Sequence, residues 1–208
     1  MMNGATLNKL HDMRLSAMAE AYRQQLSDPA IATLEFEERF GLLVDAEWSR
    51  RKSNRLNKLI RKADLQHSSA AIENIEYHAD RKLDKGQIAR LAGCAYITEK
   101  HNIIILGASG SGKTYLSCAF GIAACRNFYT VKYVRLPDLL NEMAVARGEG
   151  IYQKVRNHYQ KVSLLILDEW LLLPLTSSEA RDVLEIVEAR HKRASTIFSS
   201  QFAPAGWH

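Results

Sequence analysis

Residues 107–114 read GASGSGKT, a stretch that fits the spacing G-x-x-x-x-G-K-[ST] and decides the fold of this chain. An apolar run at residues 102–106 precedes it and predicts a buried strand, and a helical pattern begins at Lys113. Glycines let a backbone wrap closely enough to point its N–H groups at phosphate oxygens. The sequence therefore predicts a nucleotide phosphate-binding loop between a strand and a helix.

Each part of this loop has an expected chemical role. Lys113 places a cation on the β- and γ-phosphates, and Thr114 offers a hydroxyl to Mg²⁺. The N-terminus of the following helix adds the positive end of its dipole. We expect ATP and Mg²⁺ as cofactors, with phosphate contacts from Gly107, Ala108, Ser109, Gly110, Ser111, Gly112, Lys113 and Thr114.

A second apolar run, at residues 163–167, ends in two carboxylates, Asp168 and Glu169. A buried strand of an α/β sheet delivers such groups to the edge where ligands bind. Asp168 is the expected Mg²⁺ partner, directly or through water. Glu169 is the expected group to polarise the attacking water.

Polar residues also follow the last expected strand, at residues 196–200. One polar group at this position can contact the γ-phosphate and orient water, although such residues often only begin a loop. Gln201 is the first candidate and Ser200 the second. The expected catalytic residues are therefore Glu169, Lys113 and Gln201.

Strand and helix patterns alternate from residue 102 onward, which predicts a mainly parallel sheet with helices on its faces. Ser177 or Ser178 is expected to cap the last helix. We expect an α/β P-loop ATPase domain at 102–208, a linker at 71–101, and a small all-α domain at 1–70 for contact with DNA or a partner.

The first 70 residues have helical patterns with two notable features. An apolar stripe with helical spacing begins at Leu7 and continues to an interruption at residues 27–29, and a second stripe begins at Phe36. Trp48 and Tyr22 are expected in the core. Residues 66–70 are polar and are expected to form a loop.

Residues 49–62 read SRRKSNRLNKLIRK, with seven basic residues and no acidic one. Four of the basic residues share one face of a helix: Arg51, Arg55, Lys58 and Lys62. Such a ridge can neutralise DNA phosphates without reading bases. A solvated helix face is the alternative interpretation.

Composition sets broad limits. The 208 residues carry a net charge of +5, with 47 % hydrophobic and 25 % charged residues, as in ordinary globular proteins. The apolar runs are too short to span a membrane, and the N-terminus lacks the apolar core of a secretory signal. Three cysteines without a CxxC pair indicate free thiols, so we expect a cytoplasmic protein without a membrane partner.

The amino-acid sequence resembles the IstB-type transposition helper ATPases of bacterial insertion sequences, an AAA+ family related to DnaC-type helicase loaders and DnaA-type initiators. The segments that carry the resemblance are MRLSAMAEAYRQQLSDP, LEFEERFGLLVDAEW, ACRNFYTVKYVRLPDLL, LLILDEW, EARDVLEIVEAR and TIFSSQFAPAGWH. The resemblance implies an oligomer on double-stranded DNA that brings target DNA to a transposase encoded alongside. It also implies that residues 107–114 are Walker A, that Asp168 and Glu169 are Walker B, and that Gln201 stands at the sensor-1 position.

Family members continue beyond the fourth strand to a fifth, which carries an Asp-Arg element, and no segment of this sequence matches it. The resemblance implies the strand order 5-1-4-3-2, so we expect an incomplete, truncated ATPase domain whose first strand lies at an apolar edge. Two alternatives to a transposition ATPase stay open. One is a nucleotide-regulated DNA-binding adaptor with negligible hydrolysis, and the other is a helicase loader.

Overall fold

The computed structural model describes residues 2–78 and 81–207. The chain divides into two compact units, Met1–Asn57 and Lys58–His208. This division is one of packing, and the functional boundaries expected at residues 70 and 101 stay predictions.

The first unit is helical. It contains α1 (Met2–Asp12), α2 (Ser16–Ser27), α3 (Pro29–Ala32) and the greater part of α4 (Phe36–Ala63). The apolar stripe that starts at Leu7 is not one helix, because Arg14 has a left-handed φ of 59° and the chain turns between α1 and α2. The expectation of a continuous helix was wrong because apolar spacing can continue across a short turn.

Glu47 secures the start of α2 from outside that helix. The N-cap residue of α2, Leu15, has no side chain that can cap it, and Glu47 Oε2 accepts hydrogen bonds from the backbone N–H groups of Ala17 and Met18 at 2.9 and 3.2 Å. Its hydrogen bond with Arg51 lowers the pKa of Glu47, against the opposing effect of burial. A carboxylate at a helix N-terminus is stabilising because the exposed N–H groups there carry partial positive charge.

The expectation that Trp48 lies in the core was wrong. Its side chain is 59 % exposed, and the Lys52 ammonium lies 4.6 Å from the centre of its ring. A cation over an indole face is a favourable electrostatic contact that needs no burial.

The second unit contains a four-stranded parallel sheet in the described residues, with the order β1-β4-β3-β2. The strands are β1 (Ile103–Leu106), β2 (Val131–Arg135), β3 (Leu164–Asp168) and β4 (Ser195–Ser200). The parallel α/β prediction is confirmed, and the order agrees with the expected succession 1-4-3-2. Strands β3 and β4 are buried along their whole length, whereas Ile104 and Leu106 of the outer strand β1 are 49 % and 47 % exposed.

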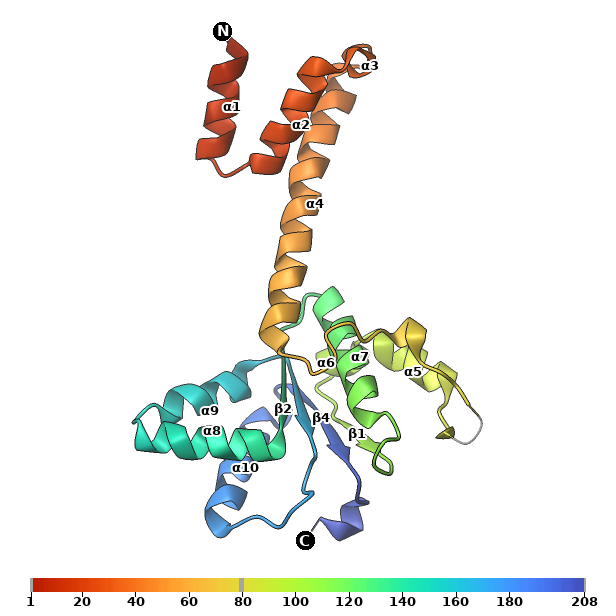
Figure 1. Cartoon of the computed structure of the whole chain (residues 1–208), viewed down its shortest axis with the longest axis vertical. Helices are drawn as coiled ribbons and strands as arrows, with labels where there is room; N and C mark the ends of the chain where they lie inside the picture. The colour runs from red at the N-terminus through yellow and green to blue at the C-terminus, as the bar shows by residue number, and fades with distance from the viewer. Residues whose placement is uncertain (1, 79–80, 208) are drawn as a thin grey trace. The chain divides into compact units, whose positions relative to one another are not determined.

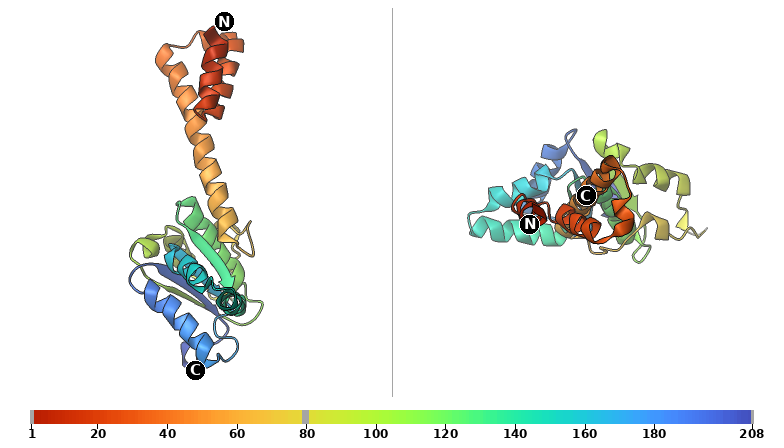
Figure 2. Two further views of the ribbon diagram at one scale, coloured as in Figure 1. Left: turned by 90° about the vertical axis from the view of Figure 1, so that its left-hand side faces the viewer. Right: turned by 90° about the horizontal axis from the view of Figure 1, so that it is seen from above.

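Helices cover both faces of this sheet (Figure 1 and Figure 2). One face carries α7 (Lys113–Arg126), with α5 (Lys85–Ala92), α6 (Ala95–Thr98) and the 3₁₀ turn Ile72–Asn74 beside it. The other face carries α8 (Leu136–Gly148), α9 (Tyr152–Lys161) and α10 (Ser177–Arg190). A further 3₁₀ turn, Pro204–Gly206, follows β4. In the described residues no helix is long and apolar enough to cross a membrane.

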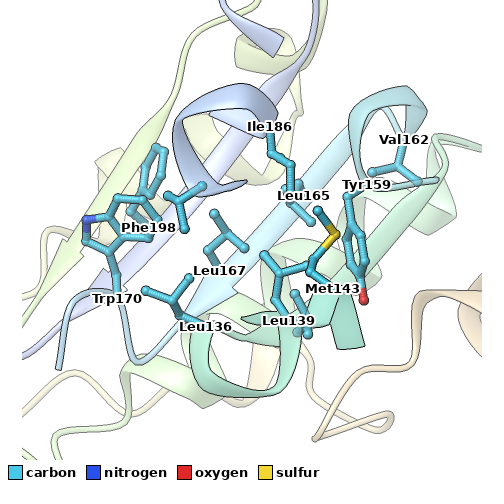
Figure 3. Packing of buried hydrophobic residues seen from close by; sticks show 12 residues of the cluster. Leu136, Leu139, Met143, Tyr159, Val162, Leu165, Leu167, Trp170, Ile186 and Phe198 are labelled. Carbon is cyan, nitrogen blue, oxygen red and sulfur yellow. The ribbon is translucent and has the colours of Figure 1, made fainter. Parts of the chain in front are cut away.

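The core on the α8 side follows from strand alternation. Leu165 and Leu167 point to the same face of β3, because successive strand residues alternate between faces. Figure 3 shows both among Leu139 and Met143 of α8 and Ile186 of α10. Each of these side chains is at most 1 % exposed, and full burial of one such side chain contributes about 1.5–3 kcal/mol.

The cap of α10 differs from the expectation. Thr176, and neither Ser177 nor Ser178, is the N-cap residue, and its hydroxyl accepts a hydrogen bond from the backbone N–H of Glu179. The Glu179 carboxylate in turn accepts a hydrogen bond from the Thr176 N–H at 2.8 Å. The acid at the third helical position selects Thr176, because only that residue completes a reciprocal capping box.

Arg190 is a buried cation that joins the ends of neighbouring elements through hydrogen bonds to backbone carbonyls and a hydroxyl. It is 2 % exposed, and its guanidinium donates to the carbonyls of Tyr159, Val162 and Ser195 and to the hydroxyl of Thr196. Burial lowers the pKa of Arg190 to about 10, which still leaves it charged at neutral pH. One side chain therefore joins the end of α9 to the start of β4.

We expect Arg190→Leu to lower the free energy of unfolding by about 3 kcal/mol, because several buried carbonyls lose their donor. Urea denaturation measures this loss. The matched control is Arg193→Leu, at an exposed position three residues further on, for which we expect a change within about 0.5 kcal/mol. Equal midpoints for the two variants would contradict the role of Arg190.

Candidate functional site

The loop between β1 and α7 has the geometry of an anion cradle. Gly112 is left-handed with φ 86°, and a Cβ atom there would lie 2.8 Å from Arg81 Nη2. Arg81 also donates from Nη2 to the Ser111 carbonyl at 3.2 Å. Glycine suits this position because its φ is one that residues with a side chain rarely adopt. Helix α7 begins at the next residue, so its free N–H groups face the loop.

Two side chains of the loop make defined contacts. Lys113 Nζ donates to the Ala108 carbonyl at 2.8 Å, so the ammonium lies over its own loop. Thr114 Oγ1 donates to Asp168 Oδ2 at 2.6 Å. The second contact joins residues that are 54 positions apart in the chain. It brings the start of α7 to the carboxyl end of β3.

Asp168 is the buried centre of the site. It is 3 % exposed, and its Oδ2 also accepts from Tyr133 Oη at 2.9 Å. Its Oδ1 accepts from the backbone N–H of Glu169 at 3.0 Å. The carboxylate is thus oriented by three donors, two hydroxyls and one amide.

Glu169 occupies the turn after β3. Its φ of 54° is left-handed, and the next residue, Trp170, donates its N–H to the Ser199 carbonyl at 2.8 Å. The Glu169 side chain is 35 % exposed, with Oε1 3.9 Å from Arg135 Nη1. Arg135 is itself held by Asp138 at 2.7 and 3.0 Å, contacts that raise the pKa of this guanidinium.

These elements enclose a cavity of about 260 Å³. It brings together the following residues that the sequence predicted: Ser109, Gly110, Gly112, Lys113, Thr114, Asp168, Glu169 and Gln201. The other predicted loop residues, Gly107, Ala108 and Ser111, line a neighbouring cavity of about 780 Å³. That second cavity shares Gly110, Gly112 and Lys113 with the first and continues along Ile75, Arg81 and Leu83.

The polar residues that end β4 have different positions. Ser200 is fully buried, and its hydroxyl donates to the Trp170 carbonyl at 2.9 Å, away from the cavity lining. Gln201 lines the cavity, and so does Ser199, which the sequence reasoning did not select. The buried Ser199 hydroxyl makes no hydrogen bond to any residue that the structure describes. Strand alternation is the signal that points to Ser199, since residues 199 and 201 are two apart.

Sequence reasoning also missed three residues outside the recognised motifs. Tyr133 reaches Asp168 from β2, and its hydroxyl lies 2.6 Å from Gln66 Oε1. His67 lines the 260 Å³ cavity, with its ring 5.9 Å from that of Tyr115. Residues 66 and 67 belong to the segment expected to be only a polar loop, and no local pattern in the sequence marks them.

The donors of the cavity fit a nucleotide with Mg²⁺. The Lys113 ammonium and the N–H groups at the start of α7 are of the kind that binds phosphate, and Ser199 lines the same cavity. Thr114 and Asp168 could supply hard oxygen ligands, and Mg²⁺ commonly takes its other ligands from phosphates and water. In the described part of the chain no group of three or more His, Cys, Asp or Glu could hold a metal by itself.

The four basic residues expected to contact DNA all lie on α4 and are exposed. The helical spacing places Arg51, Arg55, Lys58 and Lys62 on one face of that helix. Arg51 has an internal partner, because its Nε donates to Glu47 Oε1 at 2.7 Å and its Nη2 to the Arg14 carbonyl at 3.1 Å. A structural role for Arg51 therefore accompanies any contact with DNA.

Comparison with known proteins gives consistent similarities. Residues 8–208 match the family described as IstB-like ATP binding protein. The ATP-binding protein of insertion sequence IS1162 from Pseudomonas fluorescens is 40 % identical over 201 residues, which are 97 % of this chain and 87 % of that protein. The insertion sequence ATP-binding protein y4pL from Sinorhizobium fredii is 40 % identical over 203 residues, which are 98 % of this chain and 82 % of that protein.

Solved structures share the fold. The replication initiator DnaA bound to AMPPCP and single-stranded DNA superposes with a TM-score of 0.60 at 24 % identity, over 66 % of this chain. This chain covers 43 % of that DnaA chain, less than half of its length. The similarity shows that this chain shares the fold of the corresponding part of DnaA.

We expect Lys113→Ala to weaken ATP binding by at least about tenfold, because a charge-assisted contact with the phosphates is lost. Titration with a fluorescent ATP analogue measures the affinity. Lys100→Ala is the control, a lysine bound to the Ile97 carbonyl ahead of β1. An unchanged affinity in Lys113→Ala would remove this loop as the phosphate site.

Proposed function

This chain belongs to the IstB-like ATP-binding family of insertion-sequence proteins, and we propose that it hydrolyses Mg²⁺-ATP while delivering target DNA to a transposase. The observation that carries the proposal is the link between Thr114 and Asp168, at 2.6 Å, beside the half-buried carboxylate of Glu169. Phosphoryl transfer to water requires a phosphate-binding loop, a metal-binding carboxylate and a second carboxylate that can reach the attacking water.

The residues of the site divide this work among them. The loop N–H groups and Lys113 bind the β- and γ-phosphates, for which the ammonium leaves the Ala108 carbonyl. Thr114 and Asp168 hold Mg²⁺, which when bound neutralises charge on the phosphates. Glu169 orients and deprotonates the attacking water. Gln201 and Ser199 lie on the cavity wall, where they can hydrogen-bond to the γ-phosphate or to that water.

The position of Glu169 supports its role as the base. Its side chain is 35 % exposed and its contact with Arg135 is as long as 3.9 Å, so water can reach the carboxylate. Asp168, by contrast, is buried and receives three hydrogen bonds. The two neighbouring acids thus have environments suited to different tasks.

We expect Glu169→Gln to retain ATP binding within about threefold and to lower turnover at least about 100-fold, the usual scale of general-base catalysis. Phosphate release in the presence of DNA and Mg²⁺ measures turnover. Glu179→Gln serves as the control, because that carboxylate is engaged in the α10 capping box. If Glu169→Gln hydrolysed ATP at the wild-type rate, Glu169 would not be the base.

Contact with double-stranded DNA is assigned to the basic face of α4. The face presents positive charge at regular intervals, which suits a phosphate backbone and gives no base selectivity. We infer that several copies of the chain assemble on the DNA and present it to the transposase of the same element. DnaA, a structural neighbour, was solved bound to single-stranded DNA, which supports a nucleic-acid partner for this fold.

We expect the triple variant Arg55→Ala, Lys58→Ala, Lys62→Ala to bind DNA at least about tenfold more weakly and to flatten the salt dependence of binding by about 2–3 units of log–log slope. Arg51 is left intact because it supports Glu47. The control removes the same charge elsewhere, with Lys85→Ala, Lys192→Ala and Arg193→Ala. Fluorescence anisotropy at several salt concentrations measures both quantities. An unchanged slope in the α4 variant would mean that this face contacts solvent and not DNA.

A further inference from the structure

The four residues that follow α4 are built into the nucleotide-binding unit. Asp64, whose φ of 53° is left-handed, ends the helix and pairs with Lys132 of β2 at 2.8 Å. Leu65 is 8 % exposed and lies against α7, where a Cβ atom on Gly121 would come within 2.9 Å of Leu65 Cδ2. The chain is thus fixed to both a strand and a helix of the sheet domain directly after the basic face ends.

The next residue, Gln66, is the first member of a chain of hydrogen bonds that reaches the phosphate loop. Gln66 Oε1 lies 2.6 Å from Tyr133 Oη, Tyr133 Oη lies 2.9 Å from Asp168 Oδ2, and Asp168 Oδ2 lies 2.6 Å from Thr114 Oγ1. No side chain other than Tyr133 intervenes between Gln66 and the carboxylate. Only three residues separate Gln66 from Lys62, the last member of the basic face.

With the Gln66 amide oxygen turned toward it, Tyr133 cannot satisfy both of its oxygen neighbours at once. A phenol has a single O–H hydrogen, whereas Gln66 Oε1 and Asp168 Oδ2 are both acceptors at hydrogen-bond distance. The hydroxyl therefore donates to one of them at a time. A tyrosine hydroxyl keeps this hydrogen at neutral pH, because the ordinary pKa of a phenol is about 10.

The choice between the two acceptors depends on the charge at Asp168. An ionised carboxylate is the stronger acceptor, because hydrogen bonds to charged groups are roughly twice as strong as neutral ones. A cation at the same carboxylate draws on the same lone pairs and weakens it as an acceptor for Tyr133. The hydrogen then favours the Gln66 amide, which has no competing cation.

We propose that Tyr133 and Gln66 are positioning residues of the nucleotide site, and that Tyr133 shifts its hydrogen bond from Asp168 to Gln66 when Mg²⁺-nucleotide engages Asp168. The shift fastens residues 64–67, and with them the last turn of α4, to β2. Nucleotide and DNA binding are coupled as a consequence. This inference rests on the proposed function, since it takes the basic face of α4 as the DNA site.

Neighbouring contacts join the same segment to the nucleotide site. His67, adjacent to Gln66, lines the 260 Å³ cavity. On α7, one turn after Thr114, burial raises the pKa of the Cys118 thiol, an effect that the backbone N–H groups of His67 and Gln66 partly offset. Residues 66 and 67 thus contact both the helix that starts at the phosphate loop and the strand beside Asp168.

The test measures the DNA affinity of the full chain with and without a non-hydrolysable ATP analogue and Mg²⁺. The variants are Tyr133→Phe, which removes the shared hydroxyl, and Gln66→Met, which removes its second acceptor at similar volume. Tyr129→Phe is the matched control, because its hydroxyl pairs with Thr98 after the far end of α7. Affinity for the analogue is measured in parallel, with Mg²⁺ varied.

We expect the analogue to change the DNA affinity of the wild type and of Tyr129→Phe by about 5-fold or more, the lower end of typical couplings. In Tyr133→Phe and Gln66→Met this factor falls to within about twofold of unity, while nucleotide-free DNA affinity is retained. Gln66→Met also needs more Mg²⁺ for half-saturation, because Tyr133 then has no second acceptor and its hydrogen bond to Asp168 competes with the cation, whereas Tyr133→Phe removes that competing hydrogen bond and does not raise the requirement. A merely structural tyrosine would lower stability without separating these quantities.

The possible failures are distinguishable. If the wild type binds no DNA, the proposed function is wrong and the coupling with it. If the wild type binds both ligands without coupling, or if both variants keep the full coupling factor, the DNA site stands and the Tyr133–Gln66 relay is overturned. Reciprocity supplies a check, since DNA must change the affinity for the analogue by the same factor.

Discussion

The hydrogen bond between Thr114 and Asp168 depends on the parallel order of the sheet, and most of the site depends on that hydrogen bond. Strands β1 and β3 are not neighbours, because β4 lies between them. Parallel strands bring their carboxyl ends to one edge, so the loop after β1 and the acids after β3 meet above the end of β4. Ser199 and Gln201 enter the cavity for the same reason.

The turn after β3 explains how two adjacent acids acquire opposite environments. Left-handed backbone at Glu169 and Leu171 costs roughly 1–2 kcal/mol at each non-glycine residue. Between them Trp170 is 7 % exposed, donates its N–H to Ser199, and packs its ring 4.6 Å from that of Phe198. Burial of one indole offsets strain of this size. The anchored Trp170 leaves Asp168 inside the sheet and Glu169 at the cavity.

Local chemistry made the strand–loop–helix unit, the alternation of elements and the strand-end acids predictable from sequence, and the family assignment is confirmed. Features that depend on tertiary contacts were not predictable. The turn at Arg14 interrupts an unbroken apolar pattern, and the Glu47 cap joins residues about thirty positions apart. Tyr133 resembles any aromatic residue of a half-buried strand until the register of β2 and β3 is known. The roles of the individual site residues stay predictions.

The register also shows why a tyrosine, and not the nearby arginine, contacts Asp168. Arg135 is the register partner of Asp168 on β2, yet its guanidinium is held by Asp138 in a two-bond contact. An arginine paired directly with Asp168 would neutralise the carboxylate and oppose a divalent cation at the same oxygens. The hydroxyl of Tyr133 orients the carboxylate and leaves its charge intact. A neutral donor that can turn elsewhere is therefore compatible with metal binding at Asp168, whereas a fixed cation is not.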